Sequence, residues 1–247
     1  MIPANAIDHD RGTAPLAVQG VEAGYTAAPI LLGVSLVCQA GAITTIVGPN
    51  GCGKSTLLKA VVGLIPVRRG SIRIHGADVT GLAPEVMLRR GVALVPQIRG
   101  CFPRMSVEEN LLLGAYLLDS RALRRERMDE IFTVFPRLGE RRRQLAGTLS
   151  GGEQRFLELA RALIMRPDIL LLDEPSAMLA PGFLDDLFGE IRRIADRGTA
   201  VLLVEQNIRK AFEVTDRVYV FDYGTNFMDG TPRECMENPA LASLFLG

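Results

Sequence analysis

The stretch Gly48-Pro-Asn-Gly-Cys-Gly-Lys-Ser55 decides the fold of this 247-residue chain. It matches the pattern G-x-x-x-x-G-K-[ST] at every fixed position. The flanking residues supply the context that this pattern needs, because 42–47 indicates a buried strand and 56–64 an apolar-periodic helix. Small residues let successive backbone N–H groups converge on a phosphate, and the helix N-terminus adds partial positive charge. The sequence therefore predicts a strand, a phosphate-binding loop and a helix. An ordinary glycine-rich turn is the alternative, which this context disfavours.

The polar residues of the loop have separate expected roles in binding ATP and Mg²⁺. Lys54 is placed to reach the β- and γ-phosphates, and the Ser55 hydroxyl to ligate Mg²⁺. The other residues expected to surround the nucleotide are Gly48, Pro49, Asn50, Gly51, Cys52, Gly53 and Thr56.

A second motif is an apolar run that ends in two acids, Asp168-Ile-Leu-Leu-Leu-Asp173-Glu174-Pro175. We expect Asp173 to support the Mg²⁺ held by Ser55. Glu174 suits a general base that orients and deprotonates the attacking water. The alternative is a strand that ends in two solvent-facing acids. The phosphate-binding loop earlier in the chain disfavours this interpretation.

The rest of the chain predicts an α/β core with a helical insertion. Strands are predicted at 42–47, 71–74, 92–95, 169–173, 200–205 and 218–222, and several of them are continuous apolar runs typical of buried parallel strands. Three- and four-residue apolar spacing predicts helices between 106 and 166. We expect a loose arm over residues 1–15 and one domain over 16–247, with the helical insertion at about 99–166. Capping boxes mark two helix starts, at Ser106 and Ser150.

Composition excludes several classes of protein. Hydrophobic residues make up 48% of the chain, which is enough for a full core. The 28 basic and 28 acidic residues balance, so we expect no nucleic-acid partner. The four cysteines form no C-x-x-C pair, which fits a reduced, cytosolic chain. No apolar run approaches the ~18 residues that span a bilayer, so any membrane link is expected to go through a partner.

A third motif, Leu149-Ser150-Gly151-Gly152-Glu153-Gln154, opens a predicted helix. Two glycines after a hydroxyl leave the first amides free for an anion, although such a helix start can be purely structural. With the other two motifs in this order, residues 16–247 resemble the nucleotide-binding subunits of ABC transporters. The resemblance implies an α/β P-loop core with an N-terminal antiparallel β subdomain and an inserted helical subdomain. It also implies an ATPase that uses ATP and Mg²⁺.

The resemblance assigns roles to further residues. Gln97 falls at the glutamine that contacts Mg²⁺ and the attacking water, and whose loop couples the ATPase to membrane subunits. Tyr25 corresponds to the aromatic that stacks on adenine. Ser150, Gly151 and Gly152 would meet the nucleotide of a second subunit, because ATP is sandwiched between two such subunits. The alternatives are a polar loop residue for Gln97 and a core tyrosine for Tyr25.

Four longer strings narrow the resemblance: VPQIRGCFPRMSVEENL (95–111), SAMLAP (176–181), LLVEQN (202–207) and ENPALASLFLG (237–247). They resemble ATPases of branched-chain amino acid importers, and urea importer ATPases share several of them. The implied partners are a second ATP-binding subunit, identical or similar, two integral-membrane permeases and, indirectly, a periplasmic solute-binding protein. The implied location is peripheral, at the cytoplasmic face of the inner membrane. A non-transport ABC ATPase is a rival, and a GTPase is a weaker one because no N-K-x-D motif is present.

The chain also departs from the broad family. Gln206 stands where most members have a histidine that contacts the γ-phosphate, and we interpret it as a neutral γ-phosphate sensor that cannot titrate. In the segment SAMLA, Ala180 replaces the usual aspartate, and Met178 stands where the importer subtype often has glycine. These departures keep a binding-only cassette as an alternative.

Overall fold

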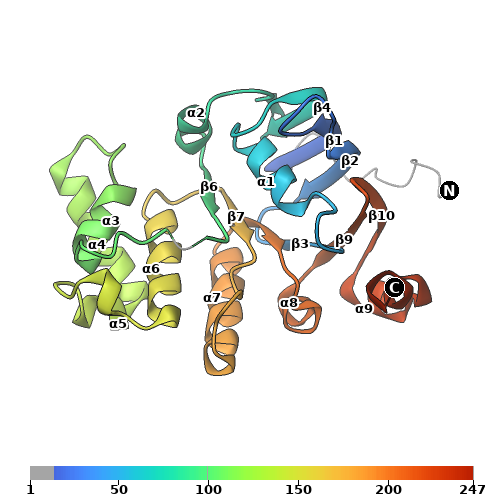
Figure 1. Ribbon diagram of the computed structural model, residues 1–247. Helices are drawn as coiled ribbons and strands as arrows, with labels where there is room; N and C mark the ends of the chain where they lie inside the picture. The colour runs from blue at the N-terminus through green and yellow to red at the C-terminus, as the bar shows by residue number, and fades with distance from the viewer. Residues whose placement is uncertain (1–13, 99, 247) are drawn as a thin grey trace.

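The structure is a computed structural model that describes residues 14–98 and 100–246. The arm expected over residues 1–15 therefore lies almost wholly outside the described residues. Two β-sheets with helices between and around them make up the described chain (Figure 1).

The first sheet is antiparallel, with the strand order β2-β1-β4-β5. Its strands are β1 (Leu16–Ala23), β2 (Leu31–Cys38), β4 (Val67–Ile74) and β5 (Ala77–Asp78). The strand predicted at 71–74 is four residues longer than expected, because β4 follows β1 over its whole length, from Leu16 opposite Ile74 to Ala23 opposite Val67. This sheet is the expected N-terminal β subdomain.

The second sheet has six strands in the order β10-β9-β3-β8-β7-β6. They are β3 (Ile43–Val47), β6 (Val92–Val95), β7 (Ile169–Asp173), β8 (Ala200–Val204), β9 (Arg217–Asp222) and β10 (Thr225–Gly230). All neighbouring pairs are parallel except β9 with the edge strand β10. Every residue of β3, β7 and β8 is buried, as expected of a sheet covered on both faces. The predicted α/β class is confirmed.

The phosphate-binding loop lies between β3 and helix α1 (Lys54–Val61). The helix begins two residues before the predicted start, because Gly53 is its N-cap and takes a left-handed conformation with φ 104°. It ends at Val61, three residues early, just before Gly63 turns left-handed. The helix N-terminus therefore begins within the loop itself.

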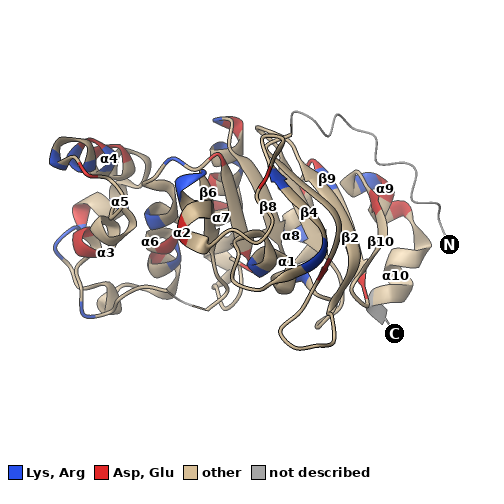
Figure 2. Ribbon diagram, turned by 90° about the horizontal axis from the view of Figure 1, so that it is seen from above, with Lys and Arg blue, Asp and Glu red and all other residues tan. Residues whose placement is uncertain are grey.

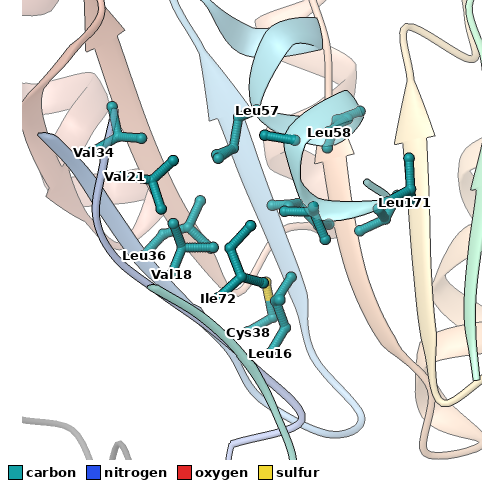
Figure 3. Packing of buried hydrophobic residues seen from close by; sticks show 14 of the residues in the cluster. Leu16, Val18, Val21, Val34, Leu36, Cys38, Leu57, Leu58, Ile72 and Leu171 are labelled. Carbon is teal, nitrogen blue, oxygen red and sulfur yellow. The ribbon is translucent and has the colours of Figure 1, made fainter. Parts of the chain in front are cut away.

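Helix α1 packs between the two sheets (Figure 3). Apolar side chains of β1, β2 and β4 point toward Leu57 and Leu58 of α1 and toward Leu171 of β7. These facing side chains are buried, and they are Leu16, Val18, Val21, Val34, Leu36, Cys38 and Ile72. Because α1 follows the loop directly, this core fixes the loop at the edge of the parallel sheet.

The remaining helices surround this core. They are α2 (Pro84–Arg89), α3 (Val107–Gly114), α4 (Arg121–Val134), α5 (Pro136–Glu140), α6 (Gly151–Leu163), α7 (Leu184–Asp196), α8 (Ile208–Val214), α9 (Pro232–Glu237) and α10 (Pro239–Leu246), with 3₁₀ turns at Ala146–Thr148 and Pro181–Phe183. Helices α3 to α6 lie together at the left in Figure 1. Basic and acidic residues lie next to each other on α4, whereas α3 carries acidic residues and no basic one (Figure 2). Among the described residues, no helix combines the length and apolar character needed to span a membrane.

Candidate active site

The carboxyl ends of the parallel strands meet at one edge of the second sheet, and the candidate site lies there. A cleft of about 410 Å³ opens at this edge. It is lined by Ile30, Asn50, Gly51, Gly53, Lys54, Ser55, Thr56, Gln97, Glu174 and Gln206. The structure thus brings nine residues of the predicted site together, although they come from four separate segments. A larger hollow, about 680 Å³, lies by the opposite end of β7, and none of the predicted site residues lines it.

Lys54 lies at the base of the loop, with only 5% of its surface exposed. Its Nζ donates hydrogen bonds to the carbonyl oxygens of Gly48 (2.8 Å) and Pro49 (3.0 Å). An ammonium group needs such partners when it is buried, because unpaired buried charge is costly. The ammonium group is therefore held at the loop before ATP binds. When ATP binds, its hydrogen bonds to these carbonyls can be replaced by hydrogen bonds to phosphate oxygens.

Ser55 and Asp173 are joined across the end of the sheet, 118 residues apart in sequence. The Ser55 hydroxyl donates to Oδ1 of Asp173 over 2.8 Å. Burial raises the pKa of Asp173, the Ser55 hydrogen bond opposes this, and the nearby Glu174 raises it further. No cluster of three or more His, Cys, Asp or Glu that could hold a metal exists among the described residues. A hydroxyl beside one carboxylate suits Mg²⁺, which takes its other ligands from phosphates and water.

Replacing Asp173 with asparagine is expected to raise the melting temperature of the nucleotide-free protein at neutral pH. The folded pKa of Asp173 is raised, so its contribution to stability is present below the unfolded pKa and lost as pH rises through the folded value. The amide oxygen can still accept the Ser55 bond without burying a charge. We expect a gain of a few degrees, since each kcal/mol shifts a chain of this size by roughly 2–4 °C.

Thermal unfolding of Asp173→Asn across pH, with the exposed Asp185→Asn as the control, checks this. The gain should disappear near pH ~4, where an aspartate of ordinary pKa is protonated in the unfolded chain. A lower melting temperature at pH 7 would contradict the sign of the effect.

Glu174 follows β7 in a left-handed conformation with φ 46°, uncommon for a residue with a side chain. Its side chain is buried at 7% exposure and is held from both sides. Nε2 of Gln97 donates to Oε2 over 2.6 Å, and Nε2 of Gln206 donates to Oε1 over 2.7 Å. Both glutamines follow the strands that flank β7, since β6 and β8 are its neighbours in the sheet. These two donors orient the carboxylate and leave each oxygen a lone pair for water.

The contact between Gln206 and Glu174 adds to the predicted role of Gln206. The sequence suggested a γ-phosphate sensor, which remains a prediction. In the structure Gln206 also lines the cleft and orients the carboxylate of Glu174. Its amide can therefore act on Glu174 and on a phosphate without titrating.

Tyr25 lies outside the cleft, on the loop after β1. It is 54% exposed, and Nζ of Lys59 on α1 donates to its hydroxyl over 2.9 Å and lies 5.2 Å from its ring centre. The exposed ring is not a core residue. Its stacking on adenine stays a prediction.

The Ser150 motif begins α6 and does not line the cleft. The expected capping box is present, since Ser150 Oγ accepts from the Glu153 amide and the Glu153 carboxylate accepts from the Ser150 amide. Gly151 and Gly152 provide the next amides at the helix start. A side chain at Gly152 would lie 2.4 Å from the ring of Phe183, so this glycine has a packing role in addition to the predicted one.

Sequence analysis missed three buried charged residues near the site. Glu205, at the end of β8, accepts from the amide and hydroxyl of Ser176 and from the Gln206 amide, and burial raises its pKa. Arg155 and Glu158 on α6 form an ion pair with side chains 5% and 2% exposed. Their spacing of three residues on one helix was the available signal, but it is equally typical of a solvent-exposed pair.

Comparison with known proteins adds an independent observation. A family model described as ABC transporter matches residues 31–177. The chain is 42% identical over 214 residues to the high-affinity branched-chain amino acid transport ATP-binding protein BraG of Pseudomonas aeruginosa, covering 87% of this chain and 91% of BraG. It is 38% identical over 228 residues to the probable branched-chain amino acid transport ATP-binding protein LivF of Archaeoglobus fulgidus, covering 92% and 96%.

Two further proteins are less similar in sequence, and one of them has a different stated role. The lipopolysaccharide export system ATP-binding protein LptB of Escherichia coli K12 is 34% identical over 236 residues, covering 95% of this chain and 98% of LptB. A solved structure of the ADP conformation of MJ1267, an ATP-binding cassette of an ABC transporter, superimposes with a TM-score of 0.83. It is 26% identical and covers 95% of this chain and 99% of MJ1267.

Proposed function

Because this chain belongs to the ABC transporter family and is an ATP-hydrolysing enzyme, we propose that it powers an importer of branched-chain or other amino acids. The observation that carries the proposal is 42% identity over 91% of BraG, a branched-chain amino acid transport ATP-binding protein. The cleft supports the enzymatic part, because it combines a buried lysine, a hydroxyl beside a carboxylate, and a clamped glutamate.

In the proposed mechanism the residues around the cleft bind the nucleotide, hold Mg²⁺ or activate water. The loop amides and Lys54 bind the phosphates of ATP, and Ser55 with Asp173 would hold Mg²⁺. The metal ion, when bound, would offset charge on the phosphates. Glu174 accepts a proton from the attacking water, while Gln97 and Gln206 hold its carboxylate in position through their hydrogen bonds.

We further propose that the working form pairs two ATP-binding subunits. The Ser150 motif does not line the cleft that holds the loop, so a second subunit, identical or similar, would present its own motif across the nucleotide. This pair would act on two integral-membrane permeases at the cytoplasmic face of the inner membrane, with a periplasmic solute-binding protein delivering the substrate. Closing on ATP and opening after hydrolysis would drive transport.

The transported substrate separates this proposal from its rivals. Urea importer ATPases share several of the sequence strings, LptB belongs to an export system, and a non-transport ABC ATPase would have no permease at all. Specificity lies in the partner proteins, so the cassette alone does not distinguish these alternatives.

Uptake by proteoliposomes that contain the chain and its two permeases would test the proposal. With the solute-binding protein present, we expect ATP-dependent uptake of leucine, isoleucine or valine and stimulation of ATP turnover by the loaded binding protein. Vesicles with the Glu174→Gln variant are the matched control and should transport nothing. Uptake of urea instead of these amino acids would contradict the proposal, as would a rate of ATP turnover that no permease changes.

A further inference from the structure

The buried ion pair between Arg155 and Glu158 lies on the face of α6 that meets the candidate site. Nη1 of Arg155 is 2.7 Å from Oε2 of Glu158. Burying such a pair is seldom stabilising, because the loss of hydration can exceed the attraction between the charges. A stabilising role alone therefore does not account for two charges at this position.

Arg155 uses all five of its N–H donors. Beyond Glu158, they reach four backbone carbonyls on the two segments that carry the predicted catalytic groups. Nε donates to Pro175 (2.9 Å) and Nη2 to Glu174 (3.1 Å), in the turn after β7. Nη1 donates to Pro96 (3.0 Å) and Nη2 to Gln97 (3.4 Å), in the loop after β6.

Glu158 and Arg161 extend this contact along the loop after β6. Oε1 of Glu158 accepts from the Gly100 amide over 2.6 Å, and Nη1 of Arg161 donates to the Gly100 carbonyl over 2.7 Å. One face of α6 thus holds Pro96, Gln97 and Gly100. The same helix begins at the Ser150 motif.

We propose that Arg155, held by Glu158, is a positioning residue that keeps Glu174 and Gln97 aligned for hydrolysis. It does not touch the cleft. It fixes the carbonyl of Glu174, whose left-handed backbone aims the side chain inward, and the carbonyl of Gln97, whose amide lies 2.6 Å from that side chain. A displacement of Pro96 and Gln97 would therefore reach Glu174 through Arg155 as well as through the Gln97 side chain. This inference rests on the proposed role of Glu174 as general base.

Replacing Arg155 with lysine tests the proposal, because lysine keeps the charge and loses the planar fork that spans both segments. We expect kcat for ATP hydrolysis to fall about 10–100-fold, because small misplacements of catalytic groups cause losses of this size. KM and the Kd for ATP should stay within about threefold of wild type. A purely structural residue would lower the folded fraction without this separation of kcat from KM. Rates are therefore normalised to the folded protein.

Arg192→Lys is the matched control. Arg192 also binds through its whole guanidinium, to Asp196, Asp216 and the carbonyls of Val214 and Gly41, but it lies away from the cleft. It should lose comparable thermal stability and keep kcat. Equal losses of kcat in both variants would overturn the proposal.

Glu158→Gln gives a second measurement if Arg155→Lys does not fold. Its single amide oxygen can replace only one of the two acceptors, so we expect a smaller loss of kcat with KM unchanged. Wild-type kcat in this variant, or a fall in KM and kcat together, would also overturn the inference.

Glu174→Gln, assayed in parallel, separates the general-base role of Glu174 from the positioning role of Arg155. Rapid turnover in Glu174→Gln would show that Glu174 is not the general base. Slow turnover in Glu174→Gln together with wild-type turnover in Arg155→Lys would reject only the positioning role of Arg155.

Discussion

Replacing Glu174 with glutamine is expected to slow ATP turnover about 10²–10⁴-fold, the usual size of a general-base contribution, while ATP still binds. Glutamine has the shape of glutamate but cannot accept the proton of the attacking water. The two donors that hold Glu174 add a second penalty. Nε2 of Gln97 and Nε2 of Gln206 each face one carboxylate oxygen, so an amide at this position would turn its own NH₂ toward one of them. The phosphate-binding loop is untouched, which is why binding should survive.

Steady-state turnover and calorimetric titration with ATP, on the same preparation, check this result. Gln206→Ala is the graded comparison, because it removes one donor and leaves Gln97 in place. We expect turnover to fall about tenfold, because one lost hydrogen bond corresponds to roughly that change in rate. Glu174→Gln with near wild-type turnover would assign the base to another group. If Gln206→Ala changed neither turnover nor nucleotide-induced dimerisation, Gln206 would have no role at the γ-phosphate.

The parallel strands and the loop were predictable because each is a local pattern. Strands 92–95 and 169–173 match β6 and β7 residue for residue, since a continuous apolar run bounded by turns leaves little freedom in assigning its ends. The start of α1 was misplaced by two residues, because the left-handed cap at Gly53 begins the helix inside the loop. Local periodicity does not report a cap of this kind.

The strand order and the network around it were not predictable from the sequence. That Gln97 and Gln206 both reach Glu174 depends on β7 lying between β6 and β8, which is a property of the sheet and not of any segment. Arg155 illustrates the same limit, because its four carbonyl partners lie 19 to 59 residues away along the chain. A single sequence carries no signal for such contacts beyond the presence of an arginine.

Replacing Lys54 with alanine is expected to abolish tight ATP binding, weakening it about 100-fold or more. A hydrogen bond to a charged group contributes about 1.5–3 kcal/mol, and the ammonium is expected to serve both the β- and γ-phosphates. The structure adds a cost within the loop itself. Removing Nζ leaves the carbonyls of Gly48 and Pro49 without the donor that holds them at 2.8 and 3.0 Å, so the loop loses part of its preformed shape.

Calorimetric titration of Lys54→Ala with ATP measures the loss, and Lys210→Ala is the control. Lys210 pairs with Asp185 and Glu213 on the surface, so its removal should change neither the affinity nor the heat of binding. Matching melting temperatures in the absence of ATP would show that the variant folds. Because Lys54 is the lysine that lines the cleft, wild-type affinity in its absence would mean that the loop does not bind the triphosphate through this charge, and the assignment of the cleft would fail.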